Sequence, residues 1–157
     1  FAILSQQKNI TLRFVVENSV PSTIQGDTDR LRDQVLGNLL SNALKFTGEG
    51  GRVLVRAWGT DRSLELEVTD SGVGIPKDKV AFIFDKFFQI GEHARSKGAG
   101  LGLAIAREVV EAHGGRISVE SEQNVGTTFR ISLPVQQPEA HTHAIGPAEP
   151  EVANANR

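Results

Sequence analysis

The sequence predicts a two-layer α/β sandwich, in which helices cover one face of a five-stranded sheet. Five short segments alternate apolar and polar side chains, which is the pattern of strands with one buried face. Two longer segments repeat apolar side chains every three to four residues, as amphipathic helices do. A sheet buried on one side against helices accounts for both patterns.

The strands are expected over residues 10–16, 53–57, 64–68, 117–119 and 129–133. The segment Gly59–Arg62 has the length and composition of a hairpin turn between the second and third strands. A polar turn that ends at Gly126 joins the last two strands, so both pairs are expected to be hairpins.

The first amphipathic segment predicts a helix over Thr28–Lys45, with Thr28 as its N-cap residue. The second predicts a helix over Leu101–His113, which Gly114 would end. A shorter helix is expected over Lys77–Phe84, because it follows a proline.

Composition limits the classes of function. The 157 residues suffice for one domain, and a net charge of −2 gives no broad basis for binding nucleic acid or an anionic membrane. No cysteine is present, which excludes disulfides and thiolate metal sites. No run approaches the roughly 18 apolar residues of a membrane span. Since methionine is absent too, we expect the chain to be a fragment of a longer protein.

One edge of the first helix carries Asn38, Asn42 and Lys45 within a narrow arc. Amide oxygens are suitable ligands for Mg²⁺, and a lysine ammonium suits phosphate oxygens. Taken alone, the same three residues could equally form an ordinary solvated helix edge.

Asp70 ends the third strand and is followed by Gly72, Gly74 and Ile75. A carboxylate in this place can accept a hydrogen bond from the amino group of adenine, and would be repelled by the oxygen of guanine. Glycines allow the backbone to approach the base closely. The alternative is a glycine-containing turn whose aspartate bonds its own backbone.

The segment Gly98–Leu103 opens the second helix with glycines at 98, 100 and 102. Free backbone N–H groups at a helix N-terminus attract phosphate. A dinucleotide fingerprint would need a third glycine where Leu103 stands and a strand directly before it. Near the last strand, Thr127 follows Gly126 and could add a hydroxyl on the adenine side, although threonine is common at a strand start.

In order and spacing, these four segments resemble the N, G1, G2 and final Gly-Thr boxes of sensor histidine kinases, and Phe84–Phe88 resembles their F box. The resemblance runs from about Ile10 to Pro134 and includes Ala112–Gly115. It implies the Bergerat fold that these kinases share with gyrase-type, chaperone and mismatch-repair ATPases. In that fold a mixed, mostly antiparallel five-stranded sheet carries about three helices on one face.

The resemblance also implies a site for Mg²⁺ and ATP. Asn42 matches the Mg²⁺ ligand, and Asp70 matches the residue that recognises adenine. The other matched residues surround the nucleotide: Asn38 and Lys45 near the phosphates, Phe46 beside the nucleotide, Gly72, Gly74, Ile75 and Thr127 around the base, and Gly98, Gly100, Leu101, Gly102 and Leu103 in the phosphate-facing loop. Residues 89–97 match the ATP lid, whose Arg95 or Lys97 is a candidate contact to the γ-phosphate.

One position separates the relatives from each other. Gyrase-like ATPases and the related serine kinases typically have glutamate where this chain has Asn38, and a carboxylate can remove a proton from water or serine. An amide cannot act as a base, whereas a neutral histidine acceptor is itself nucleophilic. Asn38 therefore favours transfer to histidine over a hydrolysing or serine-phosphorylating enzyme, and a regulatory pseudokinase is the remaining alternative.

The acceptor histidine is expected outside this chain, because His93, His113, His141 and His143 lie in no acceptor-like motif. We expect residues 1–8 to end a linker from a dimerisation domain, 9–134 to form the catalytic domain, and 135–157 to be a disordered tail. The expected partners are that dimerisation domain and the receiver domain of a response regulator. The expected setting is a cytoplasmic domain of a homodimeric kinase, with membrane anchoring of the full-length protein left open.

Overall fold

The computed structural model describes residues 2–24, 26–91 and 99–135. The strands are β1 (Thr11–Val16), β2 (Arg52–Gly59), β3 (Ser63–Asp70), β4 (Arg116–Glu122) and β5 (Gly126–Pro134). The helical elements are α1 (Ala2–Gln7), α2 (Thr28–Arg30), the π-helical η1 (Leu31–Leu36), α3 (Gly37–Phe46), the 3-10 turn η2 (Val80–Phe82) and α4 (Gly102–Ala112).

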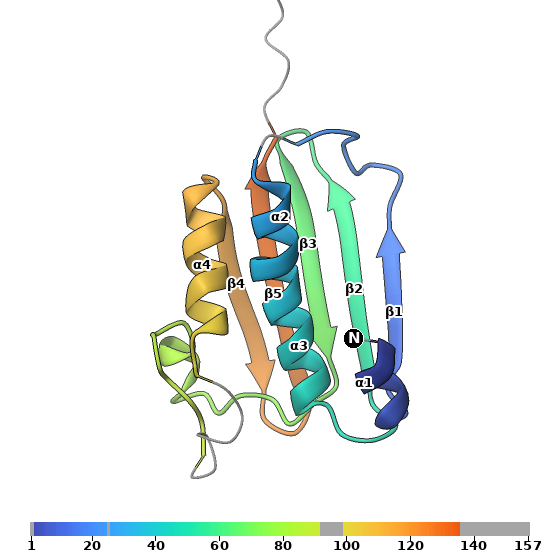
Figure 1. The fold of residues 1–157 in the computed structure, drawn as a ribbon, viewed down its shortest axis with the longest axis vertical. Coiled ribbons are helices and arrows are strands. Elements are labelled where there is room, and N and C mark those ends of the chain that lie inside the picture. The colour runs from blue at the N-terminus through green and yellow to red at the C-terminus, as the bar shows by residue number, and fades with distance from the viewer. Residues whose placement is uncertain (1, 25, 92–98, 136–157) are drawn as a thin grey trace, which may run out of the picture.

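The five strands form one sheet in the order β1-β2-β3-β5-β4. Strands β1 and β2 run parallel, and the three other neighbouring pairs run antiparallel. The long helices α3 and α4 lie on the same face of this sheet, as Figure 1 shows. The predicted two-layer sandwich with a mixed, mostly antiparallel sheet is therefore confirmed.

The core lies between that face and the helices. Its least exposed side chains include Leu39 and Leu44 on α3, Val110 on α4, and Val53 and Ile131 on the sheet. Burying a side chain of this size stabilises the fold by roughly 1.5–3 kcal/mol. The same two helices carry predicted site residues on their other edges, so core packing also fixes the site.

The predicted helix over Thr28–Lys45 is present as the continuous run α2–η1–α3, with two differences from the prediction. Its N-cap residue is Asp27, whose Oδ1 accepts a hydrogen bond of 3.0 Å from Arg30 N, and not Thr28. Both types of side chain can cap a helix, and the turn preceding the helix decides which one does. In addition, the middle segment η1 has the wider π-helical pattern.

The prediction of a helix over Lys77–Phe84 is wrong. Only Val80–Phe82 form a 3-10 turn there. Backbone hydrogen bonds join residues three apart, from Lys79 N to Pro76 O and from Phe82 N to Lys79 O, both at 2.9 Å. These tight turns direct Ile83 into the core, where it is buried.

Strand β1 is less buried than its alternating pattern predicts. It is an edge strand, and Phe14 and Val16 are 58% and 69% exposed although they face the helical side. Helix α1 lies beside the beginning of β1 (Figure 1). None of the described helices is long and apolar enough to cross a membrane.

Candidate functional site

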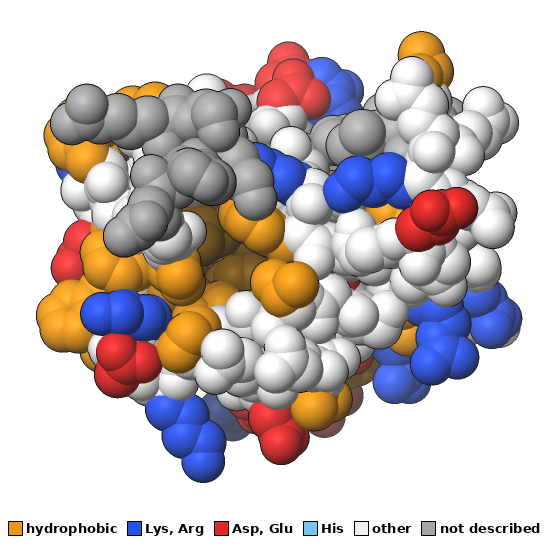
Figure 2. Space-filling model, turned by 90° about the horizontal axis from the view of Figure 1, so that it is seen from below, with side chains coloured by type: hydrophobic (Ala, Val, Ile, Leu, Met, Phe, Trp, Pro, Cys, Tyr) orange, Lys and Arg blue, Asp and Glu red, His pale blue; other side chains and the backbone are white. Residues whose placement is uncertain are grey.

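The predicted site segments meet at one end of the molecule. The end of α3, the start of α4, the end of β3 and the start of β5 all lie at the lower end in Figure 1. Seen from that end, the surface is hollowed beside apolar side chains, as Figure 2 shows. Segments far apart in the sequence thus form one surface.

Asp70 stands at the end of β3 and is 8% exposed. Its Oδ1 accepts a hydrogen bond of 2.8 Å from the backbone N–H of Gly72, and the backbone of Thr127 also donates to this carboxylate. Burial raises the pKa of Asp70 above its ordinary value, and these two backbone hydrogen bonds partly offset that effect. The two donors hold the carboxylate in a fixed orientation.

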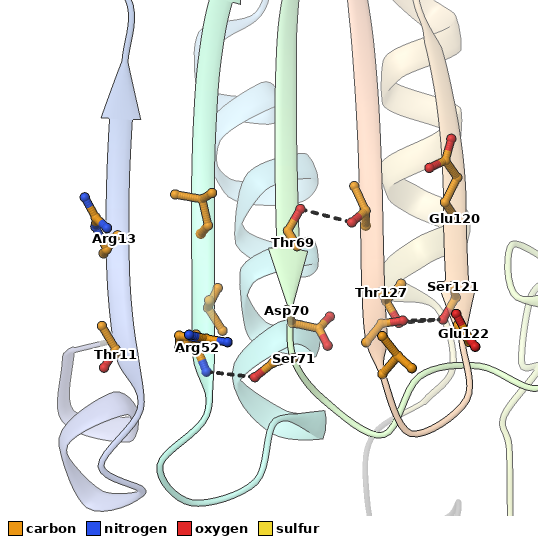
Figure 3. Close-up of a pocket in the computed structure, with 15 residues that line it drawn as sticks. Thr11, Arg13, Arg52, Thr69, Asp70, Ser71, Glu120, Ser121, Glu122 and Thr127 are labelled. Carbon is orange, nitrogen blue, oxygen red and sulfur yellow. Dashed lines mark hydrogen bonds between the residues drawn. The ribbon is translucent and has the colours of Figure 1, made fainter.

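A hollow of about 710 Å³ lies at this end of the sheet, and the residues of its wall include Asp70 and Thr127 (Figure 3). The wall also includes Arg13, Arg52 and Glu120, so the hollow lies mainly on the uncovered face of the sheet. The predicted nucleotide positions lie on the helical side of Asp70. Arg95 and Lys97 of the predicted lid fall within 92–98, which are outside the described residues.

Hydrogen bonds through two hydroxyl groups join β4, β5 and the segment after Asp70. The hydroxyls of Thr127 and Ser121 lie 2.9 Å apart and share a hydrogen bond, drawn in Figure 3. The Ser121 Oγ also accepts a hydrogen bond of 2.8 Å from Ile75 N and donates one of 3.0 Å to Gly126 O. Ser121 was missed at the sequence level, although it continues the inward-facing row of Ile117 and Val119 on β4.

The glycines after Asp70 are required by close backbone contacts. A side chain at Gly72 would place its Cβ 2.6 Å from the carbonyl oxygen of Phe46. Gly74 has a φ of +64°, and a Cβ there would collide with the carbonyl of Glu122. The structure therefore gives these glycines a role in packing the segment against α3 and β4.

On α3, the predicted residue Asn38 faces the start of α4. The Asn38 Nδ2 donates a hydrogen bond of 2.6 Å to Gln34 O, so the Asn38 Oδ1 remains as an acceptor. That oxygen lies 3.0 Å from the position of a Cβ on Gly102. Lys45 extends over the ring of Phe46, with its Nζ 5.3 Å from the ring centroid. The N-box and G2 residues are thus neighbours in space.

The described part of the predicted phosphate-facing loop ends directly in α4. Gly100 has a φ of +69°, and its carbonyl accepts a hydrogen bond of 2.9 Å from Phe87 N. Leu101 is the N-cap residue of α4 and makes no side-chain capping bond. Leu103 packs against the core, while Gly98 lies outside the described residues. An uncapped helix start suits an anion.

The donor set at this end fits Mg²⁺ held largely by a ligand's own oxygens. Within residues 2–24, 26–91 and 99–135, no group of three His, Cys, Asp or Glu side chains could hold a metal. The half-buried amide of Asn42 offers one neutral oxygen on the same helix as Asn38. Mg²⁺ commonly takes few protein ligands and completes its shell with phosphate and water.

Comparison with known proteins agrees with this geometry. Residues 26–137 match the model of the family described as histidine kinase-, DNA gyrase B- and HSP90-like ATPases. The chain belongs to this family. Among curated relatives, the sensor histidine kinase RcsC of Escherichia coli is 44% identical over 132 residues, which are 82% of this chain and 14% of RcsC.

Two solved structures that resemble this chain belong to histidine kinases, which are a narrower group within the ATPase family. The mycobacterial sensor histidine kinase MprB is 35% identical with a TM-score of 0.70, over 86% of this chain and 89% of that one. Full-length ShkA in complex with AMPPNP is 36% identical with a TM-score of 0.74, over 87% of this chain and 28% of ShkA. The chain is therefore an ATP-binding catalytic domain of the sensor histidine kinase type, and it spans a small part of RcsC and ShkA.

Proposed function

We propose that this domain binds Mg·ATP and transfers the γ-phosphoryl group to a histidine on the dimerisation domain of the same full-length protein. The observation that carries the proposal is the buried carboxylate of Asp70, fixed by two backbone donors at the end of β3. The complex of the related ShkA with AMPPNP, an ATP analogue, supports it.

At the adenine end, Asp70 accepts a hydrogen bond from the amino group of the base. Gly72, Gly74 and Ile75 line the base, and Thr127 fixes the carboxylate through its backbone. Guanine is rejected because its oxygen would face the carboxylate, an acceptor against an acceptor. Phe46, 40% exposed, lies beside the nucleotide.

At the phosphate end, Asn42 would hold Mg²⁺, while Lys45 would leave the ring of Phe46 for a phosphate oxygen. The metal would supply charge neutralisation on the triphosphate. The loop with Gly98, Gly100, Leu101, Gly102 and Leu103 would turn backbone N–H groups toward the phosphates at the start of α4.

Transfer requires positioning more than proton removal. A neutral imidazole nitrogen attacks the γ-phosphorus, the bond to the β–γ bridging oxygen breaks, and ADP leaves. Asn38 orients groups at this point and cannot serve as a base. The phosphohistidine would then supply an aspartate on a response-regulator receiver domain. We place this chemistry in the cytoplasm, within a homodimer whose linker ends near residue 8 and whose catalytic domain is 9–134.

The test combines binding and transfer. We expect calorimetric titration of the 157-residue chain to show ATP binding that strengthens with Mg²⁺, no comparable GTP binding, and little turnover. Adding the dimerisation domain from the same full-length protein should yield acid-labile phosphohistidine. Steady ATP hydrolysis by the chain alone would favour the hydrolysing alternative. Binding with no transfer to the acceptor domain would favour the pseudokinase alternative.

A further inference from the structure

The last turn of α3 has its carbonyl oxygens satisfied from three directions. Thr47 closes the helix itself, since its N and its Oγ1 both donate to Ala43 O, at 3.0 and 2.6 Å. Val73 N donates to Phe46 O at 3.3 Å. The carbonyls of the remaining residues of this turn, which a helix end normally leaves without partners, are bonded by Lys8.

Lys8 reaches this helix end from the turn between α1 and β1. Its Nζ donates to Leu44 O at 3.0 Å, to Lys45 O at 2.9 Å and to Thr47 O at 3.2 Å. One ammonium group thus uses its three hydrogens on three carbonyls, and its charge opposes the negative end of the helix dipole.

The position of Lys8 is fixed by its own backbone neighbours. Ile10 N donates to Ser5 O at 2.8 Å, and Thr11 N donates to Gly51 O at 2.9 Å, where β1 begins beside β2. Gly50 N donates to Lys8 O at 3.3 Å. The ammonium is therefore held by the sheet edge and by α1.

The same helix turn supports both halves of the proposed site. It carries Lys45 and Phe46, and it follows Asn42 by one turn. The bond from Val73 N to Phe46 O ties it to the segment after Asp70, in which Gly72 donates to the carboxylate. A shift of this turn would move the phosphate-side residues and the base-side donor together.

We propose that Lys8 is a positioning residue of the nucleotide site, acting through the last turn of α3. This inference rests on the proposed binding of ATP at that site. Lys8 also connects the segment that precedes the sheet with the helix that carries Asn42, so a displacement of α1 reaches the nucleotide through this ammonium group.

The test replaces Lys8 by methionine, which keeps the aliphatic stem and removes the charge. We expect Lys8→Met to weaken Mg·ATP binding about tenfold, which corresponds to about 1.4 kcal/mol. Exchange of the Val73 amide hydrogen should become faster, even without nucleotide, because its acceptor on Phe46 is no longer held. Lys8→Arg keeps the charge but cannot direct its planar group at three carbonyls, so it should show an intermediate loss.

Asp27→Ala is the matched control, since it removes a cap at the opposite end of the same helical run. It should leave ATP affinity and Val73 exchange within twofold of the original chain. Propylammonium added to Lys8→Ala should restore affinity, because it replaces the missing stem and charge.

Suppose that the two variants Lys8→Met and Asp27→Ala lose the same stability and also the same ATP affinity. In that case Lys8 only caps the helix, and the inference is overturned. Unchanged Val73 exchange in Lys8→Met would overturn it as well. If the unmodified chain itself failed to bind Mg·ATP, the proposed function would fail instead, and the nucleotide-free exchange experiment would still show whether Lys8 holds this turn.

Discussion

The adenine side and the phosphate side of the candidate site are built differently. On the adenine side, Asp70, Ile75, Ser121 and Thr127 are joined by hydrogen bonds between β3, β4, β5 and the segment after β3. On the phosphate side, the Asn38 side chain donates to a carbonyl of its own helix, and the Asn42 side chain makes no hydrogen bond within the described part of the chain.

This difference suggests separate tasks, with the adenine side discriminating between bases and the phosphate side binding the triphosphate and Mg²⁺. Groups fixed before the nucleotide arrives discriminate between bases at little cost in ordering. Amide oxygens and N–H groups without a competing partner can bind a metal or phosphate when one is present. We therefore expect base-side changes to affect all adenine nucleotides and phosphate-side changes to affect only those with a triphosphate and Mg²⁺.

The largest effect is expected for Asp70→Asn. Asparagine has one oxygen, which the Gly72 and Thr127 donors would claim, so its NH₂ group would face the amino group of adenine. We expect ATP and AMP to lose roughly 100-fold in affinity, about 2.7 kcal/mol, by titration calorimetry. An unchanged circular dichroism spectrum is the control for folding. Unchanged affinity would show that Asp70 does not recognise adenine.

The Asn42→Ala change should be the strongest on the phosphate side. Loss of a metal ligand should lower ATP affinity roughly 30-fold with Mg²⁺ present and leave it nearly unchanged in a metal chelator. AMP affinity should not change in either condition. If the stimulation of ATP binding by Mg²⁺ survives in this variant, Asn42 is not the ligand.

Gly100→Ala should weaken ATP binding about tenfold with little effect on AMP. At a φ of +69°, an added Cβ is strained and lies 2.9 Å from the backbone of Phe87, so the loop before α4 must shift. Gly48→Ala is the control, because a Cβ there meets nothing within 4 Å. A similar loss for AMP would mean that the loop also positions the base, and the two sides would not be separable.

A smaller effect on the adenine side is expected for Ser121→Ala. The amide of Ile75 loses its acceptor and Thr127 its hydroxyl partner, so ATP and AMP should both weaken by roughly three- to tenfold. Ser118→Ala, on the exposed side of the same strand, should change neither affinity. Equal behaviour of the two variants would indicate that the hydroxyl network does not fix the base side.

The smallest effect concerns stability against pH. Because the folded protein raises the pKa of Asp70, its neutral form is favoured, and stability is lost as pH rises from the ordinary value of 3.8 through the raised pKa. Urea unfolding should therefore show the original chain losing stability relative to Asp70→Asn over this window, with a constant difference above it. A change in the opposite direction would mean that the backbone donors outweigh burial.

Much of this fold could be predicted because local sequence patterns determine its strands and long helices. Alternation predicted the strands, which the structure confirms. The order Asn38, Asp70, Gly100, Thr127 predicted a nucleotide site, which stays a prediction. The contacts that were missed are tertiary, since nothing near Lys8 or Ser121 in the sequence shows which carbonyl or amide each meets. Residues 77–84 look helical locally, but burial of Ile83 favours successive tight turns.

The pairing of β3 with β5 sets Asp70 directly opposite Thr127. Since side chains alternate across a strand, a slip of one residue in this pairing would turn Asp70 to the uncovered face and bring Thr69 to the helical side. If Asp70 recognises adenine as proposed, base selectivity depends on the alignment of these two strands, and a single-residue deletion within β3 should abolish it even though every other residue of the site is retained.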